Sequence, residues 1–198
     1  MLIRDRLSVV LLALVLAACA STDKDPTAGW SVEKLYAEAR DEQANLQYEK
    51  AAQLFEKLEG RAAGTPLAQQ AQLEKAYAYY KNKDTALAVA ALDRFIKIHP
   101  ASPALDYALY LKGVYYADKK QYTGALEQFN KCIRADWKFI DAYIEKGIVY
   151  VELKQFQKAL KVFETATAVS PAYADSYFWM GRCYEKLEMQ DEARDNYQ

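Results

Sequence analysis

Residues 143–171, YIEKGIVYVELKQFQKALKVFETATAVSP, decide the fold. If Gly147 is counted as position 8, the small residue Ala159 falls at position 20 and Pro171 at position 32. Large residues fall at positions 4, 11, 17 and 24, which are Tyr143, Tyr150, Phe156 and Phe163. Small residues let two helices approach closely, large ones fill the gaps between helices, and a proline ends the second helix. The stretch therefore predicts a helix-turn-helix unit of about 34 residues.

The unit recurs along the chain and resembles the tetratricopeptide repeat (TPR). Gly113, Gly147 and Gly181 are 34 residues apart, whereas upstream Ala39 and Ala76 take position 8 at a looser spacing of 37. The longer joints lie at 60–66 and 99–103. The sequence therefore predicts an all-α solenoid of five repeats, the last ending near position 25. Stacking at least three such repeats produces a continuous core.

Composition argues against several function classes. The 26 Lys and Arg nearly balance the 27 Asp and Glu, whereas a nucleic-acid binder needs a basic surplus. The one histidine, His99, argues against a histidine-rich metal site, and we expect it to cap a helix C-terminus. The common glycine-rich phosphate loops are absent from the sequence. We therefore expect no cofactor, no metal and no catalysis, but a tyrosine-rich binding surface.

The first residues have the pattern of an export signal. Arg4 and Arg6 precede an apolar run over residues 7–18, which is too short for a comfortable membrane span. The run ends in Leu16-Ala17-Ala18-Cys19, which resembles the bacterial lipobox, whose cysteine is lipidated. The alternative is an ordinary secretory signal with a chance cysteine. Ala20, in place of an aspartate, implies transport to the outer membrane, where the protein would be lipid-anchored at the periplasmic face.

Four segments in the first half carry a more specific resemblance. They are AYAYYKN (76–82), ALDRFIK (91–97), HPASP (99–103) and DYALYLKG (106–113). These segments resemble the BamD/ComL family of outer-membrane lipoproteins, and the resemblance covers about residues 1–113. It implies a non-enzymatic subunit of the β-barrel assembly machinery. Such a subunit binds unfolded outer-membrane proteins and passes them to the barrel-forming, BamA-like subunit.

The second half departs from that family and resembles a generic TPR array. We therefore divide the chain into a signal peptide (1–18), a lipidated flexible tether (19–29), a BamD-like TPR region (30–113) and regular TPR repeats (114–198), the last truncated. This change in pattern, with the abrupt end at Gln198, predicts a fragment or a composite chain. The regular repeats leave open an alternative function as a periplasmic scaffold for pilus, secretion or cell-wall machinery. A cell-wall hydrolase with a TPR appendage is a third possibility, but no catalytic constellation supports it.

The first helix of each TPR lines a groove, mainly at positions 2, 5, 9, 12 and 13. In repeats one to three, the candidate groove residues are Tyr36, Arg40, Tyr77, Tyr80, Lys81, Tyr107 and Tyr110. Tyrosine offers a rigid apolar face and a hydroxyl that can bind peptide groups, and a nearby cation can meet a terminal carboxylate. The family resemblance implies that this groove receives the C-terminal signal of nascent outer-membrane proteins. The alternative is that these tyrosines only pack neighbouring helices.

Two further sets of residues have simpler interpretations. Asp141, Glu145 and Glu152 fall on the later part of the groove and are expected to form a solvated face. Cys132 and Cys183 fall two repeats apart on different helices, so we expect two buried thiols and no disulfide.

Overall fold

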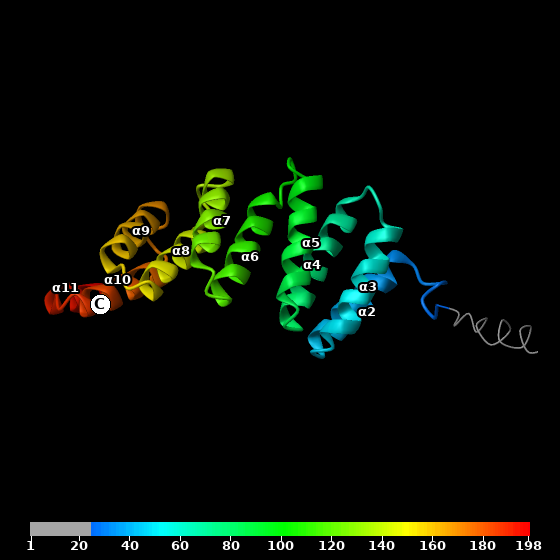
Figure 1. The fold of residues 1–198 in the computed structure, drawn as a ribbon, viewed down its shortest axis with the longest axis horizontal. Helices are drawn as coiled ribbons and strands as arrows, with labels where there is room; N and C mark the ends of the chain where they lie inside the picture. The colour runs from blue at the N-terminus through cyan, green and yellow to red at the C-terminus, as the bar shows by residue number, and fades with distance from the viewer. Residues whose placement is uncertain (1–24) are drawn as a thin grey trace, which may run out of the picture.

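The computed structural model describes residues 25–198, which form helices and connecting turns without a strand. The signal peptide and Cys19 lie outside the described residues. The helices form five consecutive pairs, one after another along the molecule (Figure 1). The pairs are α2 (Val32–Ala44) with α3 (Tyr48–Arg61), α4 (Pro66–Lys81) with α5 (Thr85–Ile98), α6 (Leu105–Asp118) with α7 (Tyr122–Ala135), α8 (Ile140–Glu152) with α9 (Phe156–Val169), and α10 (Ala174–Lys186) with α11 (Gln190–Tyr197). The predicted all-α solenoid of five TPR-like repeats is confirmed.

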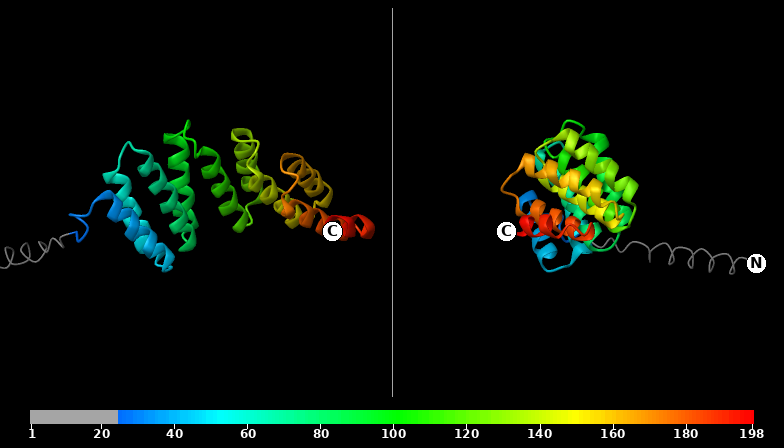
Figure 2. Two further views of the ribbon diagram at one scale, coloured as in Figure 1. Left: turned by 180° about the vertical axis from the view of Figure 1, so that it is seen from behind. Right: turned by 90° about the vertical axis from the view of Figure 1, so that its left-hand side faces the viewer.

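Each helix packs mainly against its neighbours in the chain, so the molecule is elongated, with α2 and α11 at opposite ends (Figure 2). Among the even-numbered helices, α4 contacts α6, α6 contacts α8, and α8 contacts α10. The even-numbered helices therefore form one layer, which we call the inner layer, and the odd-numbered helices form the outer layer. This arrangement lines up the first helix of each repeat, as the groove hypothesis requires.

Three glycines of the inner layer explain how the later pairs approach closely. A Cβ at Gly113 would lie 2.5 Å from the ring of Phe129, and one at Gly147 would lie 2.2 Å from the ring of Phe163. At Gly181 the nearest ring atom, from Tyr197, is 2.4 Å away. Each ring occupies the space that a side chain on the facing helix would take, so positions 8 and 24 form the contact that the repeat pattern predicts.

The first two repeats have alanine at the same inner position. Ala39 and Ala76 are fully buried, in the same apolar clusters as Phe55 and Leu92 respectively. The joint after α5 (99–104) is longer than in the later repeats, as expected, but the longer joint expected at 60–66 is wrong. The joint after α3 covers only residues 62–65, as short as the later joints, because the additional residues extend α4 instead. His99 is the C-cap residue of α5, as expected. Its backbone N–H donates to the carbonyl of Phe95 at 2.8 Å. The sequence pattern therefore placed both the helix pairs and this helix end.

The turn inside each repeat contains one residue with a left-handed backbone. These residues are Leu46, Lys83, Lys120, Lys154 and Glu188, with φ between 56° and 68°. None of them is glycine, the residue that adopts this conformation without steric cost. All five repeats therefore turn in the same way, at a non-glycine residue whose left-handed backbone is somewhat strained.

The two remaining cysteines are free and buried, as the sequence predicts. Cys132 belongs to the apolar cluster around Phe129, and Cys183 to the cluster around Phe163. Within residues 25–198, no helix combines the length and hydrophobicity needed to cross a bilayer. Residue 113, where the sequence pattern changes, lies inside α6, so the helical stack continues across that position.

Candidate peptide-binding groove

The inner layer of the first three repeats encloses a hollow of about 530 Å³. Its walls come from α2, α4 and α6, the first helices of consecutive repeats. The lining residues are Arg40 and Gln43 from α2, Gln70, Leu73, Glu74 and Tyr77 from α4, and Tyr107 from α6. Charged, amide and tyrosine side chains, with one leucine, therefore line a space large enough for part of a peptide.

A charge-neutralised cluster lies on one wall of this hollow. A guanidinium nitrogen of Arg40 lies 2.8 Å from a carboxylate oxygen of Glu74. The amide nitrogen of Gln43 donates to the other carboxylate oxygen of Glu74 at 3.3 Å. Arg40 is therefore already paired, and a free anion would have to compete with Glu74 for it.

Two tyrosines also line the hollow, Tyr77 on the same helix as Glu74 and Tyr107 on α6. Tyr107 is 42 % exposed, and its ring lies 6.3 Å from that of Tyr110. Burial raises the pKa of Tyr107, and the negative charge of Glu74 and the neighbouring Tyr77 raise it further. The ammonium group of Lys81 lies 5.6 Å from the ring centroid of Tyr77. The Tyr107 phenol therefore remains a neutral hydrogen-bonding group at ordinary pH.

Two of the predicted groove tyrosines pack inside the solenoid. The ring of Tyr80 stacks on that of Tyr115 at 4.1 Å between centroids and 7° between planes, and its hydroxyl donates to Asp118. Tyr110 packs against Phe129 and Phe139, with ring centroids 6.3 and 5.1 Å away. Both are half-buried, and both contact side chains of the next repeat.

The structure brings together three of the seven predicted groove residues on the wall of the hollow, namely Arg40, Tyr77 and Tyr107. Lys81 lies beside Tyr77, and the hydroxyl of Tyr36 accepts a hydrogen bond from the lining residue Gln70 at 2.9 Å. The assignment of all seven residues to a partner site remains a prediction.

Sequence reasoning missed three polar residues of the wall. Gln43 and Gln70 stand at positions 12 and 2 of their repeats, so the same register could have identified them. Glu74 stands at position 6, outside the positions that usually line a TPR groove, and only its pairing with Arg40 brings it into the wall.

Two buried polar atoms near the hollow have no hydrogen-bond partner within the described residues. They are the hydroxyl oxygen of Tyr115 and the side-chain oxygen of Gln43. A buried polar group without a partner costs about 1–3 kcal/mol. Unused hydrogen-bonding capacity therefore lies at the wall of the hollow, on Gln43, and beside it, on Tyr115.

Farther along the inner layer the groove is acidic. Asp141 accepts a hydrogen bond from the hydroxyl of Tyr173 at 2.6 Å. Burial raises the pKa of Glu145, and the nearby carboxylates of Asp118 and Asp141 raise it further. The expected solvated face is therefore wrong for Glu145, which lies half-buried among like charges, although Glu152 is exposed. Residues 25–198 contain no cluster of three side chains suited to hold a metal ion.

Comparison with family models places most of the described chain in one family. A model described as an outer membrane lipoprotein, YfiO, matches residues 30–165, and a TPR model matches residues 147–188. The first match contains the whole hollow. It also extends past residue 113, where the sequence resemblance was expected to end.

Curated proteins give the same result. The outer membrane protein assembly factor BamD of Neisseria meningitidis serogroup B is 46% identical over 136 residues, which are 66% of this chain and 49% of that protein. The BamD protein of Vibrio cholerae is 34% identical over 104 residues, 52% of this chain and 43% of that protein. The chain thus spans about half the length of the curated relatives it matches.

Solved structures support the architecture. A crystal structure of MamA superposes with a TM-score of 0.67 at 19% identity, over 84% of this chain and 87% of that chain. MamA of Desulfovibrio magneticus gives 0.68 at 17% identity, over 84% of this chain and 90% of that chain. At such identities the likeness concerns the solenoid fold alone.

Proposed function

Because the chain belongs to the YfiO family of outer membrane lipoproteins, we propose that it is a subunit of the β-barrel assembly machinery. In this role it binds nascent outer-membrane proteins and hands them to a barrel-forming, BamA-like subunit. The observation that carries the proposal is the hollow of α2, α4 and α6, which lies inside the matched region and presents tyrosines to a peptide. The function requires binding and release but no catalytic step.

The proposed binding surface consists of Tyr36, Arg40, Tyr77, Tyr80, Lys81, Tyr107 and Tyr110. The exposed ring of Tyr107 and the half-buried ring of Tyr77 offer apolar faces to the aromatic side chains of a barrel strand. Tyr80 and Tyr110 support these faces from below through their contacts with Tyr115 and Phe139. Lys81 and Arg40 stand at the rim, each already in contact with a groove residue.

In this proposal a lipid on Cys19 anchors the protein to the periplasmic face of the outer membrane. Of the tether predicted over residues 19–29, the last residues pack on α3, where Asp25 pairs with Lys57 at 2.6 Å and Thr27 is buried. Replacing Cys19 with Ala should release the protein into the soluble periplasmic fraction. If the variant still fractionates with the membrane, the anchor assignment is wrong.

Site-directed crosslinking tests the groove. A photo-reactive residue at Tyr107 should crosslink to a peptide from a barrel C-terminus and much less to the scrambled peptide. The matched control is the same residue at Tyr122, which is half-buried at the start of the outer-layer helix α7. Equal yields at the two positions, or with the two peptides, would remove the groove from the proposal.

Purification of the tagged chain from detergent-solubilised envelopes tests the assembly role. We expect the barrel-forming subunit to co-purify in stoichiometric amount. The alternative, a periplasmic scaffold for pilus, secretion or cell-wall machinery, is not favoured by the family match. Recovery of only pilus or cell-wall proteins would nevertheless establish it over the assembly role.

A further inference from the structure

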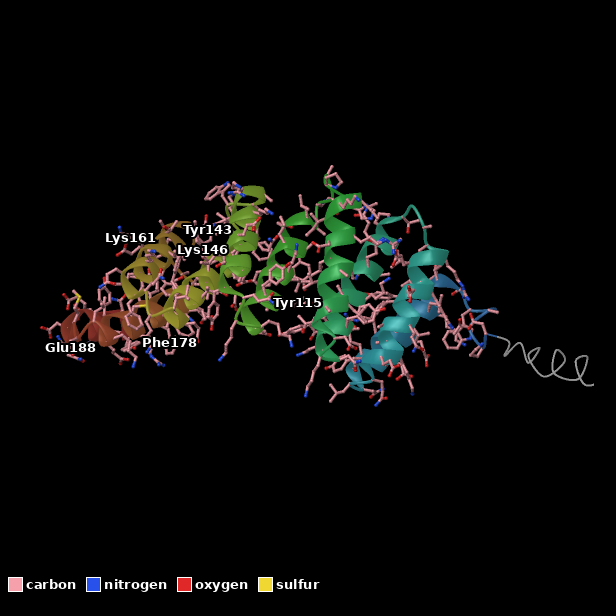
Figure 3. All side chains as sticks on the ribbon, viewed as in Figure 1. Tyr115, Tyr143, Lys146, Lys161, Phe178 and Glu188 are labelled. Carbon is pink, nitrogen blue, oxygen red and sulfur yellow. The ribbon has the colours of Figure 1, made fainter. Side chains whose placement is uncertain are left out.

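Two groups at or beside the hollow, the Tyr115 hydroxyl and the Gln43 side-chain oxygen, offer one hydrogen-bond donor and one acceptor that no residue within 25–198 uses. Tyr115 lies between α6 and α4, is 1 % exposed, and its hydroxyl has no partner (Figure 3). The side-chain oxygen of Gln43 is also buried and unpartnered, although Gln43 lines the hollow.

The neighbours of Gln43 and Tyr115 indicate which kind of hydrogen-bond partner each side chain can take. The amide nitrogen of Gln43 donates to Glu74, and this contact fixes the orientation of the amide, since a flipped amide would set oxygen against oxygen. Its remaining oxygen can accept a hydrogen bond from an N–H or an O–H donor. The ionisable groups that act on the Tyr115 hydroxyl are Tyr107, Tyr77 and Glu74, all on the wall of the hollow. After burial, which is the largest cause, these groups raise the pKa of Tyr115, so its hydroxyl is a donor that requires an acceptor.

A peptide main chain carries both complementary groups, an N–H donor and a carbonyl acceptor, at every residue. We propose that Gln43 and Tyr115 recognise the main chain of an extended peptide segment, with Gln43 accepting from an N–H and Tyr115 donating to a carbonyl. This inference rests on the proposed function and specifies its ligand. Side-chain selectivity then comes from the tyrosine faces, and the hydrogen bonds are independent of sequence.

The charges of the groove argue against recognition of a free C-terminus. Arg40 is neutralised by Glu74, whose carboxylate would repel a second one in the hollow. The adjoining part of the inner layer carries Asp118, Asp141 and Glu145, none of which forms an ion pair within the described residues. A terminal carboxylate gains little here, so an internal segment of a barrel strand binds as well as a terminal one.

The Tyr115 hydroxyl is buried, so a ligand reaches it only if a neighbouring side chain moves. Tyr107 is the most exposed of the tyrosines around the Tyr115 hydroxyl, at 42 % against 1 % for Tyr115 itself. In this proposal the Tyr107 ring, which lines the hollow, rotates to give the segment access to the Tyr115 hydroxyl.

The first test removes the Tyr115 hydroxyl and keeps its ring. With the full chain and a fluorescent decapeptide of alternating aromatic and polar residues, Tyr115→Phe should weaken binding about fivefold, the value of one hydrogen bond. Its thermal stability should not fall, because the lost hydroxyl has no partner in the free protein. The control is Tyr143→Phe, whose hydroxyl donates to the carbonyl of Trp137 at 3.1 Å, away from the hollow (Figure 3). This control should lose stability and bind the peptide normally.

The second test uses a pair of glutamines in matched settings. Both Gln43 and Gln72 donate an amide N–H to a glutamate and leave a buried oxygen unpartnered, but Gln72 faces the outer side, toward Glu59. Gln43→Met should weaken binding about fivefold, and Gln72→Met should leave binding unchanged. A decapeptide with each central amide replaced in turn by an ester lacks one N–H. At the position whose N–H binds Gln43, the ester should weaken binding to the wild-type protein. The same ester should not weaken binding to Gln43→Met any further, because that variant has no amide oxygen to accept the N–H.

The third test compares the decapeptide with a free C-terminus and with a C-terminal amide. Affinities should agree within about twofold. A tenfold preference for the free acid, or normal binding by both Tyr115→Phe and Gln43→Met, overturns main-chain recognition and leaves the peptide groove in place. If no form of the peptide binds while the barrel-forming subunit still co-purifies, main-chain recognition and the groove are both wrong, and the assembly role stands.

Discussion

The first two repeats and the last three bring their paired helices together in different ways. Repeats three to five have glycine at the inner contact and an aromatic ring in the space of the missing side chain, as Gly147 and Phe163 show. Repeats one and two have alanine there, so the facing helix must leave room for a methyl group. The same architecture therefore rests on two kinds of contact, and the looser one coincides with the longer 37-residue spacing.

A second difference concerns charge. The first region contains a nearly buried ion network in which Glu59 lies 2.7 Å from Lys75 and 3.1 Å from Arg94, linking α3, α4 and α5. The ion pairs formed within the last three repeats are exposed or half-exposed, such as Lys131 with Glu127 at 2.7 Å. The first region thus relies on charged contacts where the second relies on close packing of rings.

The largest expected effect is on the ion network. Lys75→Met removes the most buried cation beside Glu59 and should lower the free energy of unfolding by about 3 kcal/mol, because the nearly buried carboxylate loses its closest cation. Arg94 and Gln72 still bind that carboxylate, which keeps the loss near the lower end of the usual range. Urea unfolding measures it. Lys131→Met, in the exposed pair, is the control and should change stability by less than about 1 kcal/mol. Equal losses would contradict the proposed difference between the two regions.

The next effect tests the glycine contact. Gly147→Ala places a Cβ about where the Phe163 ring lies and should cost about 2 kcal/mol by overpacking. The ring cannot move freely because it is fully buried and stacks on Trp179 at 6.3 Å. Thermal unfolding checks the loss.

Two variants sharpen this result. Gly60→Ala, at a helical glycine with no atom within 4 Å of the new Cβ, should instead gain about 0.5–1 kcal/mol. Adding Phe163→Leu to Gly147→Ala recreates the alanine–leucine pair found at Ala76 and Leu92, and should recover part of the loss. If the double variant is no more stable than Gly147→Ala alone, the two kinds of contact are not interchangeable.

The two regions should also differ in how their stability depends on pH, and this effect is smaller. Burial alone would raise the pKa of Glu59, but the hydrogen bond and charge of Lys75, with Arg94 and Gln72, outweigh it and hold the pKa below its ordinary value of 4.5. Glu59 therefore stabilises the fold above pH 4.5, and this contribution is lost as the pH falls through the lowered pKa. The pKa of Glu145 is shifted in the opposite direction, because burial and its acidic neighbours raise it. The charged form of Glu145 therefore lowers the stability of the fold at neutral pH.

Glutamine variants measured by urea unfolding between pH 7 and pH 3 test this contrast. At pH 7, Glu145→Gln should be more stable than the wild type by up to about 1 kcal/mol, and the gain should vanish below pH 4.5. Glu59→Gln should be less stable at pH 7, and its deficit should shrink only below pH 4.5. The same sign for both variants at pH 7 would refute the assignment.

The smallest effect should be the same in both regions. Lys83→Gly and Lys120→Gly relieve a left-handed backbone at an exposed turn, one in each region, and each should gain about 0.5 kcal/mol. Calorimetry of the single and double variants should give equal and additive gains. A gain confined to one region would indicate that the difference between the halves extends to their turns.

Most of the fold could be predicted because its contacts repeat. The spacing of Gly113, Gly147 and Gly181 located the later helix pairs, and position 24 correctly named the ring that meets each glycine. The ion network around Glu59 could not be predicted, because its members come from three helices at spacings that follow no period.

The candidate site was predictable to a lesser degree. The positions of Tyr77 and Tyr107 within their repeats placed both residues on the inner layer, because position within a helix decides which face a side chain occupies. The repeat positions could not show that Glu74 pairs with Arg40, or that Tyr80 stacks beneath the surface on Tyr115. Those facts depend on how far the second repeat is rotated against its neighbours, which a single-repeat pattern does not encode.

The restriction of helix contacts to near neighbours in the chain has a consequence for biogenesis. A fold of low contact order can form before the last residues of the chain are present, because each repeat completes its interactions once the next repeat has folded. A chain that emerges N-terminus first across a membrane can therefore assemble α2 through α6, and with them the whole peptide hollow, while later repeats are still in transit.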